Sequence, residues 1–274
     1  MRVTLATQPA KPGQDNEDFV AATPSAVVLL DGAGLSGTDS GCRHGVAWYT
    51  RQLGATLIAR LAGDDGSDLT DILAEAIKAV AESHTNTCDL DHVGTPSTTV
   101  IIVHVHDGVL GHLVLADSVL LIHQRDGRND VITDDREAHV ARPYRSAMTS
   151  TTHGTPEHEK ARRVFMNAIR AHRNRPGGFW VAAANPSAAY ESITGLRPIE
   201  DVESVALLSD GASRLVDRFD IQTWADTVAT LRDRGPEALI AEVRRAESSD
   251  PEGSHWPRGK TYDDATAAYC TDLS

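Results

Sequence analysis

Acidic residues lie at the ends of several apolar runs in this 274-residue sequence. The positions that share this feature are Glu17, Asp18, Asp31, Asp117, Asp210 and the pair Asp263 and Asp264. A single aspartate after a strand usually marks a turn, but several strands that end in this way can bring their carboxylates to one edge of a sheet. Like charges gathered there must be neutralised by protons or cations. Because all-oxygen clusters suit Mg²⁺ or Mn²⁺ better than zinc, the pattern predicts a divalent metal site.

The elements that would position these acids can be predicted from the apolar pattern. Short apolar runs between Gly- and Pro-containing turns predict strands at residues 3–7, 19–22, 26–30, 98–106, 111–115, 119–123, 179–183, 204–209 and 265–270. Apolar residues at helical spacing predict helices at 42–61, 69–84, 155–172, 221–232 and 236–246. Because strands and helices come in blocks, we expect a layered α+β fold and not βαβ alternation. No repeat or low-complexity linker divides residues 1–274, which we interpret as one domain.

The composition restricts the kinds of partner. The chain has 26 basic and 39 acidic residues, a formal net charge of −13, which disfavours nucleic acids and anionic membrane surfaces as partners. The sequence has no apolar run of about 18 residues and its N-terminus has no signal-peptide core, so we expect a cytoplasmic protein. The three cysteines, Cys42, Cys88 and Cys270, are far apart and predict no disulfide framework. The sequence does not predict the oligomeric state.

Six short motifs occur in the order of a known family. They are Asn16-Glu17-Asp18, Asp31-Gly32-Ala33-Gly34, Ser97-Thr98-Thr99, Ala116-Asp117-Ser118, Ser209-Asp210-Gly211 and Asp263-Asp264-Ala265-Thr266. Together they resemble the NED, DGxG, (G/S)TT, GDSR, SDG and DNxT motifs of the metal-dependent protein phosphatase 2C family, in its bacterial form. The resemblance spans nearly the whole chain. It implies a four-layer αββα sandwich, in which two antiparallel sheets are flanked by helices.

The resemblance also implies a reaction and a ligand set. The reaction is hydrolysis of phosphoserine or phosphothreonine in proteins, with a dinuclear Mn²⁺ or Mg²⁺ centre that activates water for in-line attack. The implied catalytic residues are Asp31, Asp210 and Asp263: Asp31 bridges two ions, and the other two are direct ligands. The Gly32 carbonyl holds one ion, Glu17 and Asp18 bind directly or through water, and Asp117 matches the position that holds a third ion.

The sequence departs from the family pattern at three positions. Gly13 stands where the family has a phosphate-binding arginine, Ala33 stands where some members have a histidine, and Val119 replaces the arginine of GDSR. Arginine forms bidentate hydrogen bonds with phosphate that glycine cannot replace. Lys11 or Arg43, or the basic stretch with Arg162 and Arg163, could substitute for it.

Because every core ligand position is retained, we favour an active protein phosphatase, with a flap-like variable region within residues 137–201. Two alternatives stay open. One is a phosphatase that acts on a small phosphorylated metabolite with the same fold. The other is a weakly active or inactive module that binds phosphoproteins.

Other chemistries are disfavoured by spacing. A cysteine phosphatase needs an arginine six positions after the cysteine, but positions 48 and 94 are Trp and Gly. Residues 253–261 do not have the spacing of a phosphate-binding loop. Neither Cys42 with His44 nor His104 with His106 has the further Cys/His spacing of a closed zinc site, so we interpret them as a helix start and a solvated strand face.

Overall fold

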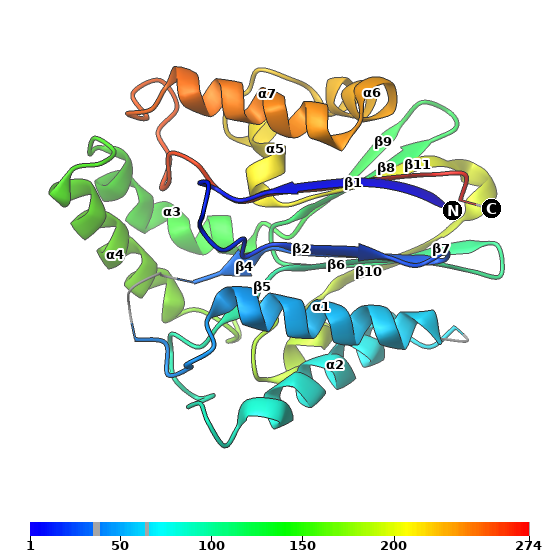
Figure 1. The fold of residues 1–274 in the computed structure, drawn as a ribbon, viewed down its shortest axis with the longest axis horizontal. Helices are drawn as coiled ribbons and strands as arrows, with labels where there is room; N and C mark the ends of the chain where they lie inside the picture. The colour runs from blue at the N-terminus through cyan, green and yellow to red at the C-terminus, as the bar shows by residue number, and fades with distance from the viewer. Residues whose placement is uncertain (35–38, 64–65, 274) are drawn as a thin grey trace.

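The computed structural model describes residues 1–34, 39–63 and 66–273. Two five-stranded antiparallel sheets stack face to face in it (Figure 1). The first has the order β1 (Arg2–Gln8), β12 (Ala265–Thr271), β11 (Val202–Leu208), β8 (Val119–Gln124) and β9 (Asn129–Ile132). The second has the order β10 (Ile193–Pro198), β7 (Val109–Leu115), β6 (Val100–His106), β3 (Ala26–Leu30) and β2 (Phe19–Ala22). A two-residue ladder joins β4 (Gly32–Ala33) to β5 (Ser97–Thr98).

Helices cover both outer faces of the sandwich (Figure 1). Below the second sheet lie α1 (Val46–Ala62) and α2 (Leu69–His84). Above the first sheet lie α5 (Asp210–Asp217), α6 (Trp224–Arg234) and α7 (Pro236–Ser249). At one end, α3 (Arg136–Thr149) and α4 (Pro156–Arg170) pack against each other. Short 3₁₀ helices span Pro186–Glu191 and Ile199–Asp201. The predicted α+β fold of four layers, αββα, is therefore confirmed.

The strand β3 shows why the central runs are apolar throughout. Alternate side chains of a strand point to opposite faces of its sheet. Val28 and Leu30 pack with Leu53 of α1 beneath the second sheet, whereas Val27 and Leu29 join the layer between the two sheets. Both faces of β3 are covered, so all five of its residues are buried.

Several boundaries differ from the sequence expectations. The strands at 19–22 and 26–30 and the helix at 69–84 form as predicted, and Thr155 caps α4 by accepting a hydrogen bond from the His158 amide. The predicted strand at 179–183 is wrong, because the segment forms only isolated bridges, such as Thr98 with Ala182. Helix α3 was not predicted, since Pro143 in its interior and its polar composition hide the helical pattern.

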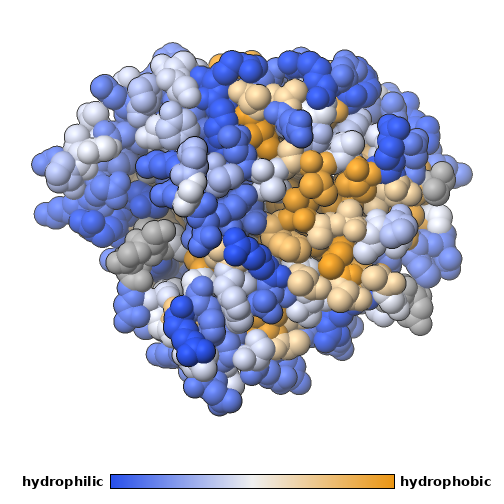
Figure 2. Space-filling model, viewed as in Figure 1, coloured by the Kyte–Doolittle hydropathy of each residue, from blue (hydrophilic) through white to orange (hydrophobic). Residues whose placement is uncertain are grey.

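The edge strands of the two sheets, β1 and β2, run side by side on one face (Figure 1). Figure 2 shows apolar residues gathered over this region of the surface. The Leu5 side chain, on β1, is 45% exposed.

Among the helices that the structure describes, none is long and apolar enough to cross a membrane.

Candidate metal centre

The acids of the sequence pattern meet at the edge of the sandwich where α3 and α4 lie. Asp31 follows β3, Asp117 lies between β7 and β8, and Asp210 follows β11 and begins α5. The Asp210 amide donates a hydrogen bond of 3.0 Å to Oδ2 of Asp31, which joins the two sheets at this point. Burial raises the pKa of Asp31 well above its usual range, and the neighbouring carboxylates of Asp18, Asp210, Asp263 and Asp117 raise it further. The predicted gathering of carboxylates is present.

Asp18 carries the clearest sign of a missing partner. Its side chain is buried, and neither carboxylate oxygen has a hydrogen-bond partner among the described residues. The segment is held in place because the Asp18 amide donates to Asn16 Oδ1 (2.9 Å) and Asn16 Nδ2 donates to Thr7 Oγ1 (2.7 Å). Burial raises the pKa of Asp18 to about 7, the nearby Thr266 hydroxyl partly offsets this, and the Asp264 and Asp210 carboxylates raise it further. An unpartnered buried carboxylate is costly unless a proton or a cation neutralises it.

The Ser97-Thr98-Thr99 segment positions Asp31 through its backbone. Thr98 Oγ1 and the Thr99 amide donate to the Asp31 carbonyl at 2.8 and 2.9 Å. The Asp31 amide donates to Thr99 Oγ1 at 3.2 Å. A further bond of 2.6 Å between the Thr99 and Ser118 hydroxyls links this segment to the turn that carries Asp117. The threonine motif thus sets the position of Asp31 and leaves its carboxylate facing the cluster.

Two glycines allow the backbone segments of the site to approach closely. A Cβ on Gly32 would lie 2.5 Å from the Glu17 carbonyl oxygen and 2.5 Å from Cγ1 of Val46. A Cβ on Gly211 would lie 1.8 Å from the Asp264 carbonyl oxygen. Any larger residue would push the Glu17 and Asp264 segments away from the aspartates that follow β3 and β11.

Asp117 has an acidic neighbour that sequence reasoning missed. Ala116, directly before it, adopts a left-handed backbone with φ of 72°, unusual for a residue with a Cβ. Burial and Asp210 raise the pKa of Asp117 to about 7. Burial, Asp117 and Asp210 raise the pKa of Glu137 to about 8. Glu137 comes from the unpredicted α3, so no sequence signal connected it to the site.

Asp263 is neutralised by cations of the chain itself. Its Oδ1 accepts from Lys260 Nζ at 2.6 Å, and its Oδ2 accepts from Arg214 Nη2 at 2.9 Å. Burial alone would raise the pKa of Asp263, but Lys260 and Arg214 outweigh burial and lower it. Arg214 also pairs with Glu247 at 2.6 Å. Neither Lys260 nor Arg214 was predicted, although Lys260 lies in the 253–261 stretch that the spacing argument rejected.

Asp264 has a structural role beside the cluster. Its Oδ1 accepts from the Ala10 amide at 2.7 Å, and its Oδ2 accepts from the Glu17 amide at 2.8 Å. Both bonds fix the segment before β2 against the start of β12. Burial raises the pKa of Glu17, although Lys260 partly offsets this. Glu17 is therefore held at the rim of the cluster by its own backbone.

Two cavities open onto these residues. One, of about 200 Å³, is lined among others by Asp31, Gly32, Asp117, Glu137, Asp210, Asp263, Arg145, Arg218 and Lys260. A neighbouring one, of about 530 Å³, has Lys11, Glu17 and Lys260 in its lining. Arg43 lines neither cavity; its Nε lies 3.4 Å from Nε2 of His44. Of the cations suggested for the substrate phosphate, Lys11 lines the larger cavity, Arg162 lines both cavities, and Arg43 and Arg163 line neither.

The donor set fits hard divalent cations. The available groups are carboxylates and a backbone carbonyl, which Mg²⁺ and Mn²⁺ prefer. The unpartnered oxygens of Asp18 and the raised pKa values of Asp31, Asp117 and Asp210 all indicate that this cluster needs positive charge. Asp263 already has its positive charge from Lys260 and Arg214, so it is the least available ligand of the set.

Comparison with known proteins identifies the family. No curated protein matches the chain. The structure is similar to the serine/threonine phosphatase PstP/Ppp of Mycobacterium tuberculosis (19% identity, TM-score 0.58, 98% of this chain and 97% of that one). It is also similar to Stp1 of Staphylococcus aureus (13%, 0.57, 98% and 94%). A structure of the PstP catalytic domain in complex with two manganese ions has 19% identity and a TM-score of 0.53, with 98% and 96% covered. These structures share the fold, and the sequence profile of protein phosphatase 2C matches residues 7–244. The chain therefore belongs to the protein phosphatase 2C family of metal-dependent protein phosphatases.

Proposed function

We propose that this protein hydrolyses phosphoserine and phosphothreonine in proteins with two divalent ions, Mn²⁺ or Mg²⁺, at the carboxylate cluster. The observation that carries the proposal is Asp18, a buried carboxylate with two unpartnered oxygens, in a cluster with Asp31 and Asp210. Such a cluster is stable at neutral pH only when protons or cations neutralise it. The family and the manganese-bound PstP structure support the choice of ion.

Each proposed ligand has a distinct place in the site. Asp18, Asp31 and Asp210 would hold the ions: the carboxylates of Asp18 and Asp210 both act on Asp31, and the Asp210 amide orients Asp31 by donating to its Oδ2. The Gly32 carbonyl and Glu17 complete the set. When bound, the ions supply Lewis-acid chemistry, which activates water and offsets the charge of the phosphate. Asp263 would join this set if its Oδ1 lost the bond with Lys260. Asp117 and Glu137, which line the same cavity, would hold a third ion.

The phosphate contacts differ from the family pattern, because Gly13 supplies no side chain. We infer that Arg145 of α3 and Arg218, which follows α5, take over this task. Both line the 200 Å³ cavity, and neither guanidinium forms an ion pair among the described residues. Burial and the nearby Arg218 lower the pKa of Arg145, and the acids Glu137 and Asp117 partly offset this effect. Lys260, on the same wall, would contact the phosphate as a point charge.

A metal-titrated activity measurement tests the proposal. The protein is stripped with EDTA, and Mn²⁺ is added back with p-nitrophenyl phosphate, a phosphothreonine peptide or a phosphoprotein as substrate. We expect no turnover without metal and turnover of all three substrates with it. Absence of any turnover by protein that has bound Mn²⁺ would overturn the enzymatic proposal. Turnover of p-nitrophenyl phosphate alone would redirect the search to small phosphorylated molecules.

Lys260 competes with metal for Asp263, so removal of its charge should strengthen metal binding. For Lys260→Met we expect the Mn²⁺ concentration at half-maximal activity to fall about tenfold. This change corresponds to a gain of ~1.4 kcal/mol in the free energy of Mn²⁺ binding, a modest effect for the removal of one nearby unit charge. The KM for p-nitrophenyl phosphate should rise, because a phosphate contact is lost. Lys78→Met, on the exposed pair with Glu82 of α2, is the matched control and should change neither value. Weaker Mn²⁺ binding in Lys260→Met would contradict this competition.

A further inference from the structure

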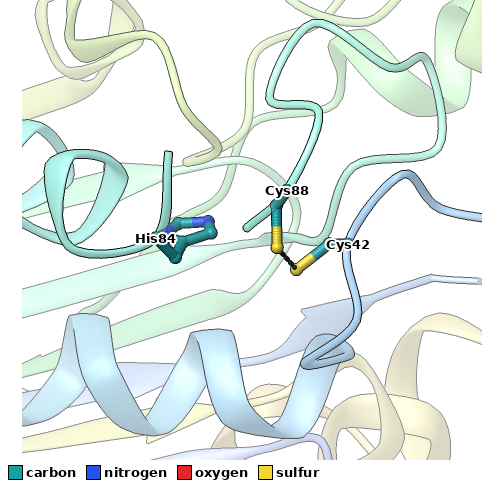
Figure 3. A group of neighbouring side chains, drawn as sticks. All are labelled: Cys42, His84 and Cys88. Atoms are coloured by element: carbon teal, nitrogen blue, oxygen red, sulfur yellow. Dashed lines mark hydrogen bonds between the residues drawn. The ribbon is translucent and has the colours of Figure 1, made fainter. Parts of the chain in front are cut away.

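Two cysteines and two histidines meet outside the carboxylate site. Cys42 and His44 precede α1, His84 is the last residue of α2, and Cys88 lies in the loop that follows. Ligand atoms of Cys42, His84 and Cys88 all lie within 4.8 Å of one another. Figure 3 shows the two sulfur atoms facing each other, with the His84 ring beside them. His44 Nδ1 lies 3.7 Å from the Cys42 sulfur and 3.4 Å from the Cys88 sulfur.

The packing fixes the orientation of both imidazoles. His84 Nδ1 lies 2.6 Å from the Val80 carbonyl oxygen, one helical turn earlier, so Nδ1 carries the proton and Nε2 is free to act as a ligand. A ligating histidine commonly donates its other N–H to a backbone carbonyl in this way. His44 stacks on Trp48 with ring centroids 4.2 Å apart, and Trp48 also meets the edge of His84 at 5.0 Å. The exposed Arg43 Nε donates to His44 Nε2 at 3.4 Å, so His44 must transfer its proton from Nδ1 to Nε2, and Arg43 must move away, when Nδ1 binds a metal ion.

The distances match a tetrahedral metal site better than a disulfide. The sulfurs are 3.1 Å apart, whereas a disulfide bond is about 2.05 Å long. With metal–sulfur and metal–nitrogen distances of about 2.3 and 2.0 Å, tetrahedral geometry separates two sulfurs by about 3.8 Å and a sulfur and a nitrogen by about 3.5 Å. The distances from His44 Nδ1 to the two sulfurs, 3.7 and 3.4 Å, lie on either side of this value, and the sulfurs, now 3.1 Å apart, would have to separate by about 0.7 Å.

We propose that Cys42, His44, His84 and Cys88 form a structural site for Zn²⁺ or another thiophilic divalent ion. Two thiolates and two imidazoles select such an ion over Mg²⁺ or Mn²⁺, which prefer oxygen. The site is therefore chemically distinct from the carboxylate cluster and does not depend on the proposed function. Neither Cys42 with His44 nor His84 with Cys88 is a closed site by itself; each pair is completed by the other, forty or more residues away in the chain.

Its effect on the structure follows from the segments it joins. The Cys42 segment leads from Gly32 to α1, and Val46 at the start of α1 packs against Gly32. The Cys88 segment touches the same loop, because the Asp89 amide donates to the Gly41 carbonyl at 2.8 Å. A metal ion here would fix both loops and the first turn of α1, and through Val46 it would steady the Gly32 backbone.

Cobalt spectroscopy tests the proposal on the intact protein. Reduced, metal-free protein is titrated with Co²⁺ without oxygen, in the presence of excess Mg²⁺ to occupy the carboxylate site. We expect one equivalent to bind with a sulfur-to-cobalt charge-transfer band, which oxygen ligands cannot produce, and Zn²⁺ to displace it. Zinc should also raise the Tm of the metal-free protein. Absence of the charge-transfer band would overturn the proposal, and loss of two thiols on mild oxidation with no such band would assign the pair as a redox disulfide.

Two variants locate the site, and two others serve as controls. Cys88→Ser and His84→Ala should each lose the charge-transfer band or reduce its intensity more than tenfold at one equivalent of Co²⁺, with folding checked by circular dichroism. Cys270→Ala, which removes the buried cysteine of β12, is the matched control and should keep the band. Asp210→Asn should also keep it while it loses phosphatase activity, so the two sites can fail separately. A band retained in Cys88→Ser would show that the ligands are elsewhere.

Discussion

Asp31→Asn and Asp210→Asn should each lower Mn²⁺-dependent turnover of p-nitrophenyl phosphate by at least ~100-fold, the upper range for residues that only orient a metal ligand. Both side chains face the cluster, and the Asp210 amide holds Oδ2 of Asp31 at 3.0 Å. Asparagine keeps the volume and one acceptor oxygen, but it removes the negative charge on which a divalent ion depends. The measurement is kcat as a function of Mn²⁺ concentration, together with direct Mn²⁺ binding by calorimetry.

The same variants should affect stability in the opposite direction. In the metal-free protein, Asp31 lies among the like charges of Asp18, Asp210 and Asp263, and its pKa is raised by burial and by these neighbours. Neutralising it removes repulsion, so the Tm without metal should be equal to or higher than that of the wild type. The rise in Tm on addition of Mn²⁺ should be lost. A simple folding defect would lower both activity and Tm, which this pattern excludes.

Asp217→Asn is the matched control for Asp210→Asn. Asp217 is on the same helix, α5, and its Oδ2 accepts a hydrogen bond from Ser213 Oγ, which asparagine can still accept. Its side chain lines neither cavity. Turnover and Mn²⁺ affinity should stay within about threefold of the wild type, since surface changes away from a site have small effects. Equal losses in Asp217→Asn and Asp210→Asn would mean that the acidity of α5 as a whole, and not a ligand at Asp210, supports activity.

The carboxylate cluster could be predicted from sequence because its geometry is local to each strand. Asp31 and Asp210 directly follow the runs that become β3 and β11, so the buried strands carry them to one edge. The two sheets stack face to face, so the ends of β3 and β11 meet across the sandwich, where the Asp210 amide donates to Asp31 Oδ2. The strand-end pattern therefore predicted the position of these acids before any family resemblance was considered.

Other parts of the site depend on contacts between distant segments, which no periodicity encodes. Glu137 enters from α3, whose interior proline hides the helix in the sequence. Lys260 reaches Asp263 from an irregular loop, and its role depends on the fold of that loop. The Cys42 and Cys88 segments meet only because α1 and α2 pack side by side. Spacing arguments work within one segment, and they fail where tertiary packing assembles the ligands.

The metal-free protein should lose stability as the pH rises from 6.5 to 8. Burial raises the pKa of Asp18 and of Asp117 to about 7 and that of Glu137 to about 8, whereas the same groups in the unfolded chain titrate near 4. Between these values the folded state holds more protons than the unfolded state, so stability falls with increasing pH. Each group contributes up to about 1.4 kcal/mol per pH unit until the pH passes its folded pKa. Above its folded pKa the group is charged in both states, and the loss of stability that it causes no longer changes with pH.

The window from pH 6.5 to 8 lies above the pH range in which two groups of opposite sign, His112 and Asp263, act. Burial lowers the pKa of His112 to about 4, so its contribution grows with pH but is complete above about 6.5, the pKa of an unfolded histidine. The lowered pKa of Asp263 gives stability that is present above about pH 4 and lost only in acid. Neither group therefore changes the slope within the window. The measurement is Tm in EDTA at intervals between pH 6.5 and 8.

Manganese should reverse this loss, and more strongly at higher pH. At pH 6.5 an ion must displace protons from Asp18, Asp117 and Glu137, whereas at pH 8 most of those protons have already left and the ion meets unneutralised charge. The Mn²⁺-induced rise in Tm should therefore be larger at pH 8 than at pH 6.5. In Glu137→Gln the highest of the three pKa values is absent, so the fall in Tm between pH 7 and 8 without metal should be shallower. A Tm in EDTA that is constant or rises across this window would mean that the carboxylates do not share the repulsion on which the proposed metal centre depends.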